Sequence, residues 1–230
     1  MKKFLTLMTI FGLVLGIVSA SFAAKAETKA KSDKVEKTGS STKDYAVTFN
    51  PFALIFGFAW GGLWISGGFE AMISSPISIQ ADVDFLTFPS AGWNNSAVGL
   101  NVKGRYYLNQ YIKLWEPKLG GISGWYGAAG IGFYSSTVSY STENSGGKEE
   151  WSGTAFFIGP SIEFGYKYIF DDGALKDFFF EPCVGFTLLF GSYKWTYKIN
   201  GAEQPESGTI PAGTYTPGGF LFGIRIGYSF

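Results

Sequence analysis

The C-terminal segment alternates between apolar side chains and side chains that are mostly small or charged. Apolar residues occupy every second position from Phe220 to Phe230, and the positions between them include three glycine or serine residues and Arg225. Because successive side chains of a β-strand point to opposite faces, this pattern predicts a strand with one apolar face. A soluble sheet buries such a face against a core, whereas a membrane strand turns it toward lipid. This choice constrains everything else that the chain can fold into.

The N-terminus has the layout of a secretory signal peptide. Lys2 and Lys3 make a short basic start, residues 4–20 form an apolar stretch without a charge, and small residues follow. This order predicts a signal peptide over residues 1–23, with cleavage after Ala23 or after Ala26. The alternative is a transmembrane helix, but the apolar run is short for a span of about 20 residues and ends in small residues. We therefore expect export.

The rest of the chain divides into a polar segment and one domain. Residues 24–44 are rich in Lys, Ser, Thr, Asp and Glu and predict a flexible periplasmic tail. Residues 45–230 suit a single domain and carry ten Lys or Arg against fourteen Asp or Glu, a formal net charge of −4. This balance gives no reason to expect a nucleic-acid partner. Cys183 is the only cysteine, which excludes an intrachain disulfide.

Short alternating segments broken by Gly, Pro, Asn, Asp and Ser run through this domain and are typical of β-strands. Eight are expected, each with the roughly 9–11 residues that a membrane strand needs. An even number of strands places both ends of the domain on one side. The predicted strands are 45–56, 63–73, 77–88, 97–108, 125–139, 155–170, 178–194 and 219–230.

The connections fit an up-and-down order of antiparallel strands. Short turns are predicted at 74–76 and 171–177, whereas the connection 110–122 is longer than a turn requires. Asn50-Pro51 interrupts the first strand, where we expect a bulge or a strand edge because Pro lacks the ladder N–H. The opposite end is predicted to carry the outer loops, at 57–62, 89–96, 140–152 and 197–218, of which the last two are the longest and most polar.

The charges of the predicted strands fall on the face opposite to the apolar residues. A Lys or Arg on a lipid face costs about 2–4 kcal/mol at the bilayer midplane, so this placement favours apolar side chains outside and charges inside. Five acids and four bases are predicted to share the interior. They are Glu70, Asp82, Asp84, Lys103, Arg105, Glu163, Lys167, Glu181 and Arg225.

The predicted interior set favours a closed core. Side chains just fill an eight-stranded barrel, and buried charges persist only when they are paired, so we predict a salt-bridged plug rather than an open pore. Asp82 and Asp84 could also be interpreted as a catalytic or calcium-binding pair. A structural ion cluster is the better interpretation, because Lys103 and Arg105 are expected on the next strand. A soluble lipocalin-like barrel would instead crowd the aromatics, 19% of the chain, into one small core.

The signal, the eight segments and the aromatic last strand resemble small bacterial outer-membrane β-barrel proteins of the OmpA and OmpX kind. Short motifs resemble an uncharacterised subgroup of these barrels, namely Asn50-Pro51, Gly67–Glu70, Arg105–Leu108, Gly165–Lys167 and Phe180–Pro182. The resemblance implies an all-β, eight-stranded, antiparallel up-and-down transmembrane β-barrel in the outer membrane, with both barrel termini in the periplasm.

The resemblance also implies partners. The barrel would contact outer-membrane lipid and lipopolysaccharide. The barrel-insertion machinery would read the outward residues of the last strand during biogenesis. These residues are Ile224, Ile226, Tyr228 and Phe230.

The chain contains no histidine. A serine or threonine nucleophile therefore has no imidazole to take its proton, and the common imidazole metal ligand is missing. We expect no enzymatic activity, no cofactor and no metal. The expected role is structural, or a surface interaction through the loops with an unspecified ligand. The alternative is a narrow channel or lateral conduit for small solutes, suggested by the glycine-rich inner face near Gly127, Gly130 and Gly132.

Overall fold

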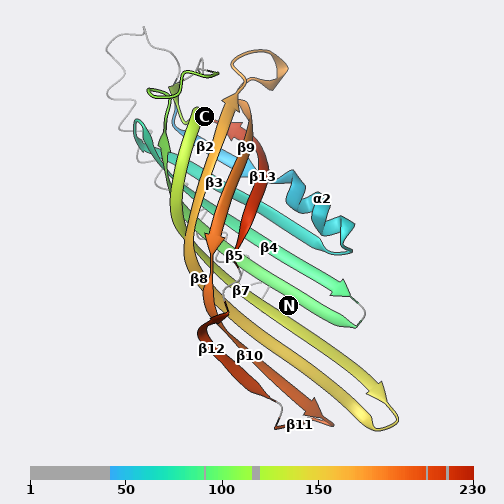
Figure 1. Cartoon of the computed structure of the whole chain (residues 1–230). Coiled ribbons are helices and arrows are strands. Elements are labelled where there is room, and N and C mark those ends of the chain that lie inside the picture. The colour runs from blue at the N-terminus through green and yellow to red at the C-terminus, as the bar shows by residue number, and fades with distance from the viewer. Residues whose placement is uncertain (1–41, 91, 116–119, 206, 216–217) are drawn as a thin grey trace, which may run out of the picture. The chain divides into compact units, whose positions relative to one another are not determined.

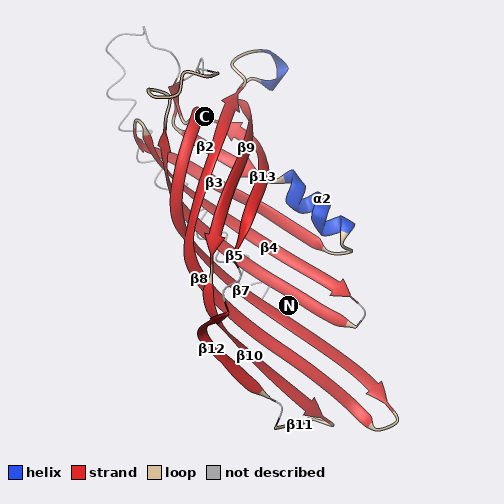
Figure 2. Cartoon of the chain, in the orientation of Figure 1, coloured by secondary structure: helices blue, strands red, loops and turns tan. Residues whose placement is uncertain are grey.

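The computed structural model describes residues 42–90, 92–115, 120–205, 207–215 and 218–230. The predicted signal peptide, 1–23, and the predicted tail up to residue 41 lie outside the described residues. The described residues are mainly β-strand, and antiparallel pairing joins eight of the strands into a closed ring (Figures 1 and 2).

Each ring strand pairs with its neighbour in chain order, and the last strand pairs back with the first. This is the predicted up-and-down connectivity. The ring strands are β2 (Tyr45–Phe49), β3 (Leu63–Ser74), β4 (Ile77–Ser90), β5 (Trp93–Tyr107), β7 (Gly124–Asn144), β8 (Gly147–Ile169), β9 (Phe178–Leu188) and β13 (Gly218–Ser229).

Several strands continue well beyond the predicted ends. The ladder between β7 and β8 runs without a break to Asn144 and Gly147, so most of the predicted loop 140–152 is strand. β10 (Phe190–Ile199) continues past Leu189 in the same register against β8, and it also pairs with β11 (Ala202–Glu203) and β12 (Gly208–Tyr215). The predicted loop 197–218 is therefore largely strand. The predicted loop 89–96 is largely strand as well, because β4 ends at Ser90 and β5 begins at Trp93.

Cross-strand aromatic pairs explain why these polar extensions remain paired. The rings of Trp93 and Tyr140 stack with their centroids 4.7 Å apart, and those of Trp151 and Tyr197 with theirs 4.0 Å apart. Each pair joins directly opposite residues of neighbouring strands, an arrangement that stabilises a sheet where no buried core does.

The predicted strand 45–56 is confirmed only up to Phe49. The prediction of strand beyond it, with a bulge or strand edge at Asn50-Pro51, is wrong. β2 ends at Phe49, and the helix α2 (Pro51–Ala59) follows. Asn50 Oδ1 accepts hydrogen bonds from the backbone N–H groups of Phe52 and Ala53 at 3.1 and 3.2 Å. Pro is favourable in a first helical turn because the N–H that it lacks would be unpaired there. No described helix is long and apolar enough to cross a membrane.

Replacing Asn50 with alanine is expected to destabilise the fold by about 1 kcal/mol, because two backbone donors at the start of α2 lose their acceptor. Asn50→Asp keeps a capping oxygen and serves as the matched control, with a smaller expected loss. Chemical denaturation of the refolded protein measures both. Equal stability of the wild type and the alanine variant would mean that the cap does not hold α2.

The outside of the ring is apolar and exposed. Ile79, Leu100 and Phe164 are 45%, 41% and 40% exposed, although each lies in a strand that is paired on both sides. Charged residues of the ring strands point inward and are buried, among them Arg105 at 1% and Glu181 at 0%. This arrangement is the reverse of the lipocalin-like barrel considered as an alternative.

One end of the ring, which we call the turn end, carries the turn at residues 75–76, the 3₁₀ turn η1 (Gly173–Leu175) and the C-terminal residue Phe230. A buried apolar cluster fills the interior there. It contains Ala46, Met72, Tyr107, Ile122, Tyr126, Ile169 and Phe179.

The long connection between β5 and β7 helps to close the turn end. Its residue Ile122 is fully buried in the apolar cluster, and β6 (Gly120–Gly121) pairs in parallel with β1 (Thr42–Lys43). Lys43 Nζ lies 2.6 Å from Asp177 Oδ1, and this hydrogen bond lowers the pKa of the Asp177 carboxyl. The last residues of the predicted flexible tail are therefore fixed against the ring.

Candidate functional site

Charged side chains from six ring strands meet inside the ring, next to the apolar cluster. Eight of the nine predicted interior residues form ion pairs with one another, and we call these eight the ion network. Its members are Glu70 on β3, Asp82 on β4, Lys103 and Arg105 on β5, Glu163 and Lys167 on β8, Glu181 on β9 and Arg225 on β13.

Arg105 lies at the centre of the ion network. Its two terminal nitrogens donate to the two carboxylate oxygens of Glu181 at 2.7 and 3.1 Å, a bidentate contact that fixes the orientation of both groups. The same guanidinium lies 3.0 Å from Glu70 and 3.2 Å from Glu163. Because these acids belong to three other strands, the side chain of Arg105 joins opposite parts of the wall.

The other three bases extend the ion network across the ring. Lys103 Nζ lies 2.7 Å from Glu163 and 3.0 Å from Asp82. Arg225 lies 2.7 Å from Glu163 and 2.8 Å from Glu181. Lys167 pairs with Glu70 and lies 3.2 Å from Glu181.

Asp84 differs from the prediction because it lies outside the ion network. It makes no ion pair with another described residue, and Trp64 Nε1 donates to its Oδ1 at 3.4 Å. The reason is its position along the strand. Asp84 lies two residues farther along β4 from the turn end than Asp82. The residues opposite it in the sheet are Ser66 on β3 and Gly99 on β5, and neither is a base.

Neutral side chains complete the ion network, and sequence reasoning missed them. Tyr126 Oη lies 2.9 Å from an oxygen of Glu163 and 2.9 Å from one of Glu181, which share its single hydroxyl hydrogen. The centroid of its ring lies 4.1 Å from the Arg105 guanidinium carbon. Tyr107 Oη and Ser78 Oγ both donate to Glu70, at 2.8 and 2.5 Å. All three residues share the inward alternation of the charged set, and this signal could have identified them.

Small residues on the inner face make room for the long charged side chains. In register, Ala128 lies between Arg105 and Glu163, and Gly130 lies between Lys103 and Ser161. A Cβ atom on Gly130 would approach Lys103 Cγ to 2.6 Å, too close for a real contact. Of the three glycines that suggested a channel, Gly130 and Gly132 are adjacent to the inward side chains of Lys103 and Tyr134. Gly127 is not on the inner face, because it lies opposite the outward residues Tyr106 and Phe164.

The ion network balances its charges. Four acids face four bases, and all but Arg225 have side chains at most 9% exposed. Desolvation of an unpaired charge costs several kcal/mol, so each buried charged group needs its ion-pair partners in order to stay buried. The arrangement can hold strands together and fill the ring.

Comparison of the chain with known protein families, with curated proteins and with solved structures finds no match.

The residues predicted as an insertion signal lie on one face of β13. Ile226, Tyr228 and Phe230 are 40%, 43% and 46% exposed on the outside of the ring, and Ile224 is half-buried on the same face. Among the described residues, no three carboxylate or thiol groups lie close enough to hold a metal ion.

Proposed function

We propose that this protein is an integral outer-membrane β-barrel with a structural or surface-interaction role. One observation carries the proposal: apolar side chains face outward and charged ones face inward all around the ring. In water, an outer wall with so many half-exposed Ile, Leu, Phe and Val side chains would be a large aggregation surface. In a bilayer the same wall is solvated by acyl chains.

The interior supports a closed rather than a conducting barrel. The ion network joins strands across the ring, and the apolar cluster, which includes Ile122 from the connection between β5 and β7, occupies the turn end. A solute crossing the ring would have to break several buried ion pairs at once. The absence of histidine in the sequence argues against the usual hydrolytic chemistries, so we propose a non-enzymatic protein without a cofactor.

The strand extensions favour a surface role. β7 has 21 residues and β8 has 23, about twice the 9–11 that cross a bilayer. The part beyond the bilayer is a paired sheet with polar side chains on its outward face, such as Ser139, Ser141 and Glu150. A rigid sheet held away from a membrane presents a fixed surface to a partner.

The first test is location and closure. In outer-membrane fractions the protein is expected to migrate differently on a gel before and after boiling, because a closed barrel resists unfolding by detergent. In planar bilayers, the refolded protein is expected to show no large stable conductance. Recovery in the soluble periplasmic fraction would contradict the membrane assignment, whereas a large steady channel would contradict the closed interior alone.

The second candidate is a lateral conduit, favoured by an incomplete wall. β2 pairs with β13 over only four residue pairs, from Ala46 to Phe49. Farther from the turn end, β13 has no strand partner on its β2 side among the described residues, and α2 lies beside it (Figure 1). Liposome swelling with small solutes tests this candidate, and an unchanged swelling rate relative to empty liposomes would exclude a conduit for them.

A further inference from the structure

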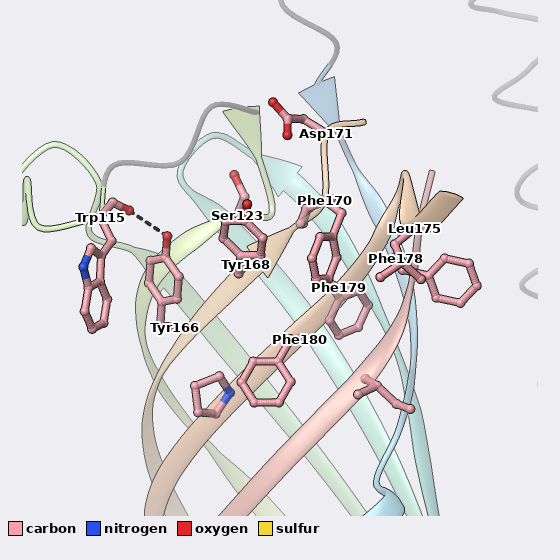
Figure 3. Close-up of a pocket in the computed structure, with 13 residues that line it drawn as sticks. Trp115, Ser123, Tyr166, Tyr168, Phe170, Asp171, Leu175, Phe178, Phe179 and Phe180 are labelled. Carbon is pink, nitrogen blue, oxygen red and sulfur yellow. Dashed lines mark hydrogen bonds between the residues drawn. The ribbon is translucent and has the colours of Figure 1, made fainter. Parts of the chain in front are cut away.

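Two features interrupt the apolar wall of the ring. One is a hollow of about 770 Å³ over β8, β9 and β13 (Figure 3), where outward side chains such as Phe180 line the surface and β9 remains paired with both of its neighbours. The other is the gap beside β13, where β2 ends early and α2 follows (Figure 1). At the gap the strand backbone itself is left uncovered, so this feature decides how the wall closes.

One edge of β13 lacks a strand partner over part of its length. Successive residues of an antiparallel strand direct their N–H and C=O groups to alternate sides. Phe230 and Tyr45 exchange both backbone hydrogen bonds, at 2.9 and 3.1 Å, so the even-numbered residues of β13 face β2. β2 ends at Phe49, opposite Ile226, and the even-numbered residues beyond have no strand partner on that side among the described residues. They are Ile224, Phe222, Phe220 and Gly218.

The uncovered edge of β13 is unfavourable in a membrane. The hydrocarbon of a bilayer offers no water to unpaired N–H and C=O groups, so open sheet edges do not occur there. α2 does not replace the missing strand, because the backbone groups of a helix bond mainly within the helix. The side chain of Phe222 is 83% exposed, the highest value among the large apolar side chains of the described residues, and this exposure marks the place where a neighbouring strand is missing.

α2 is attached to β3 by two small residues. Gly62 N–H donates to Gly57 O at 2.8 Å, and a Cβ atom on Gly57 would collide with the backbone nitrogen of Trp64. Ala53 and Gly57 are the buried residues of the helix, whereas its other residues are exposed or half-buried. Unwinding of the helix would therefore uncover little apolar surface that is now buried.

The sequence of α2 also suits a strand. Large apolar residues occupy the even positions from Phe52 to Phe56. Val47 points outward on β2, and one extra residue at Asn50-Pro51 would turn this even-numbered set outward too, in a bulge where a strand accepts Pro. The bulged strand would continue the observed register and supply partners to three of the uncovered residues of β13. The pairs would be Phe52 with Ile224, Leu54 with Phe222 and Phe56 with Phe220.

We propose that residues 50–56 form a gate that switches between the helix α2 and a strand that continues β2. The helical state leaves the gap beside β13 open to the bilayer, and the strand state closes the wall. The inference rests on the proposed membrane location, because only in hydrocarbon does the uncovered edge need a partner. The cap at Asn50 and the contact of Gly57 with β3 favour the helix, whereas pairing with β13 favours the strand.

The test is a distance measurement by electron paramagnetic resonance between nitroxide labels on Phe52→Cys and Phe56→Cys, in a Cys183→Ser protein refolded into phospholipid vesicles. These positions are 38% and 46% exposed, so the labels displace no buried side chain. Four residues span about 6 Å along a helix and about 13 Å along a strand. Both distances are expected in vesicles. Asn50→Ala is expected to raise the ratio of the long to the short distance about fivefold, because only the helix uses the capping oxygen.

Ile158→Cys with Ile162→Cys in the same background is the matched control, because both positions face outward on β8 and are 40% and 61% exposed. This pair is expected to give the long distance alone, with or without Asn50→Ala. Only the short distance between positions 52 and 56, in a protein with heat-modifiable migration, would overturn the gate and leave the barrel proposal standing. A ratio that Asn50→Ala leaves unchanged would overturn the gate as well. A wild type without heat-modifiable migration would overturn both proposals.

Discussion

Replacing Arg105 with alanine is expected to lower the free energy of unfolding by about 3–5 kcal/mol. The guanidinium contacts Glu70, Glu163 and Glu181 and is fully buried. Its removal changes the balance of the ion network to four acids and three bases, and the freed carboxylate oxygens cannot reach water without rearrangement. The loss lies at the lower end of this range if Lys167 and Arg225 move to cover the unpaired acids.

The measurement is a denaturant titration of the refolded protein, in which the midpoint and the slope are followed together. Lys148→Ala is the matched control, because Lys148 also forms an ion pair, with Glu150 at 2.5 Å, but its side chain is 55% exposed. Exposed pairs contribute about 0–1 kcal/mol. Similar losses in both variants would mean that the ion network contributes no more than a surface pair.

Arg105→Lys separates charge from geometry. Lysine keeps the positive charge but cannot make the bidentate contact with Glu181, and it has fewer donors to share among three acids. We expect a stability between those of the wild type and the alanine variant. A lysine variant as stable as the wild type would show that the charge alone holds the network.

Strict alternation made the strands predictable, because it identifies both the strand and its outward face. The seven strands from residue 63 onward contain the predicted residues, apart from one or two at an end and the break at Leu189. The polar extensions were missed because alternation of Ser, Thr and charged residues carries no hydrophobic signal. Aromatic pairs such as Trp151 and Tyr197 hold those extensions, and a pairing between distant segments is not visible in either segment alone.

The first strand was mispredicted for a different reason. Residues 51–59 are apolar at almost every position, so their pattern favours neither a strand nor a helix. The deciding signals were Asn50 as a cap and Pro51 in the first turn. These are helix-start signals, and they outweighed the β-propensity of Phe52, Ile55 and Phe56.

The ion network shows what alternation determines and what it leaves open. The parity of each residue along its strand gives the face, so the inward set was predictable from the sequence. The level of a residue along the axis of the ring depends on the register between strands, and the alternation within one strand does not specify that register. Asp84 has the right parity but the wrong depth, whereas Tyr126 has the right depth and was not considered because it is uncharged.

Replacing Val102 with arginine is expected to destabilise the protein by about 2–4 kcal/mol in vesicles. Val102 is 40% exposed on the outside of β5 and lies level with Ala81 and Ile131. In a barrel that spans a bilayer this level is close to the midplane, where a guanidinium has no partner. On the surface of a soluble protein, the same substitution at a half-exposed position changes stability by about 0.5 kcal/mol or less.

Ser141→Arg is the control for the same charge elsewhere. Ser141 is exposed on the outward face of β7, in the part of the strand that extends beyond the ring, where an arginine is expected to reach water at almost no cost. Unfolding titrations of both variants in the same vesicles make the comparison direct. A Val102 variant as stable as the Ser141 variant would place the outer wall in water and would leave its apolar side chains needing a protein partner instead of lipid.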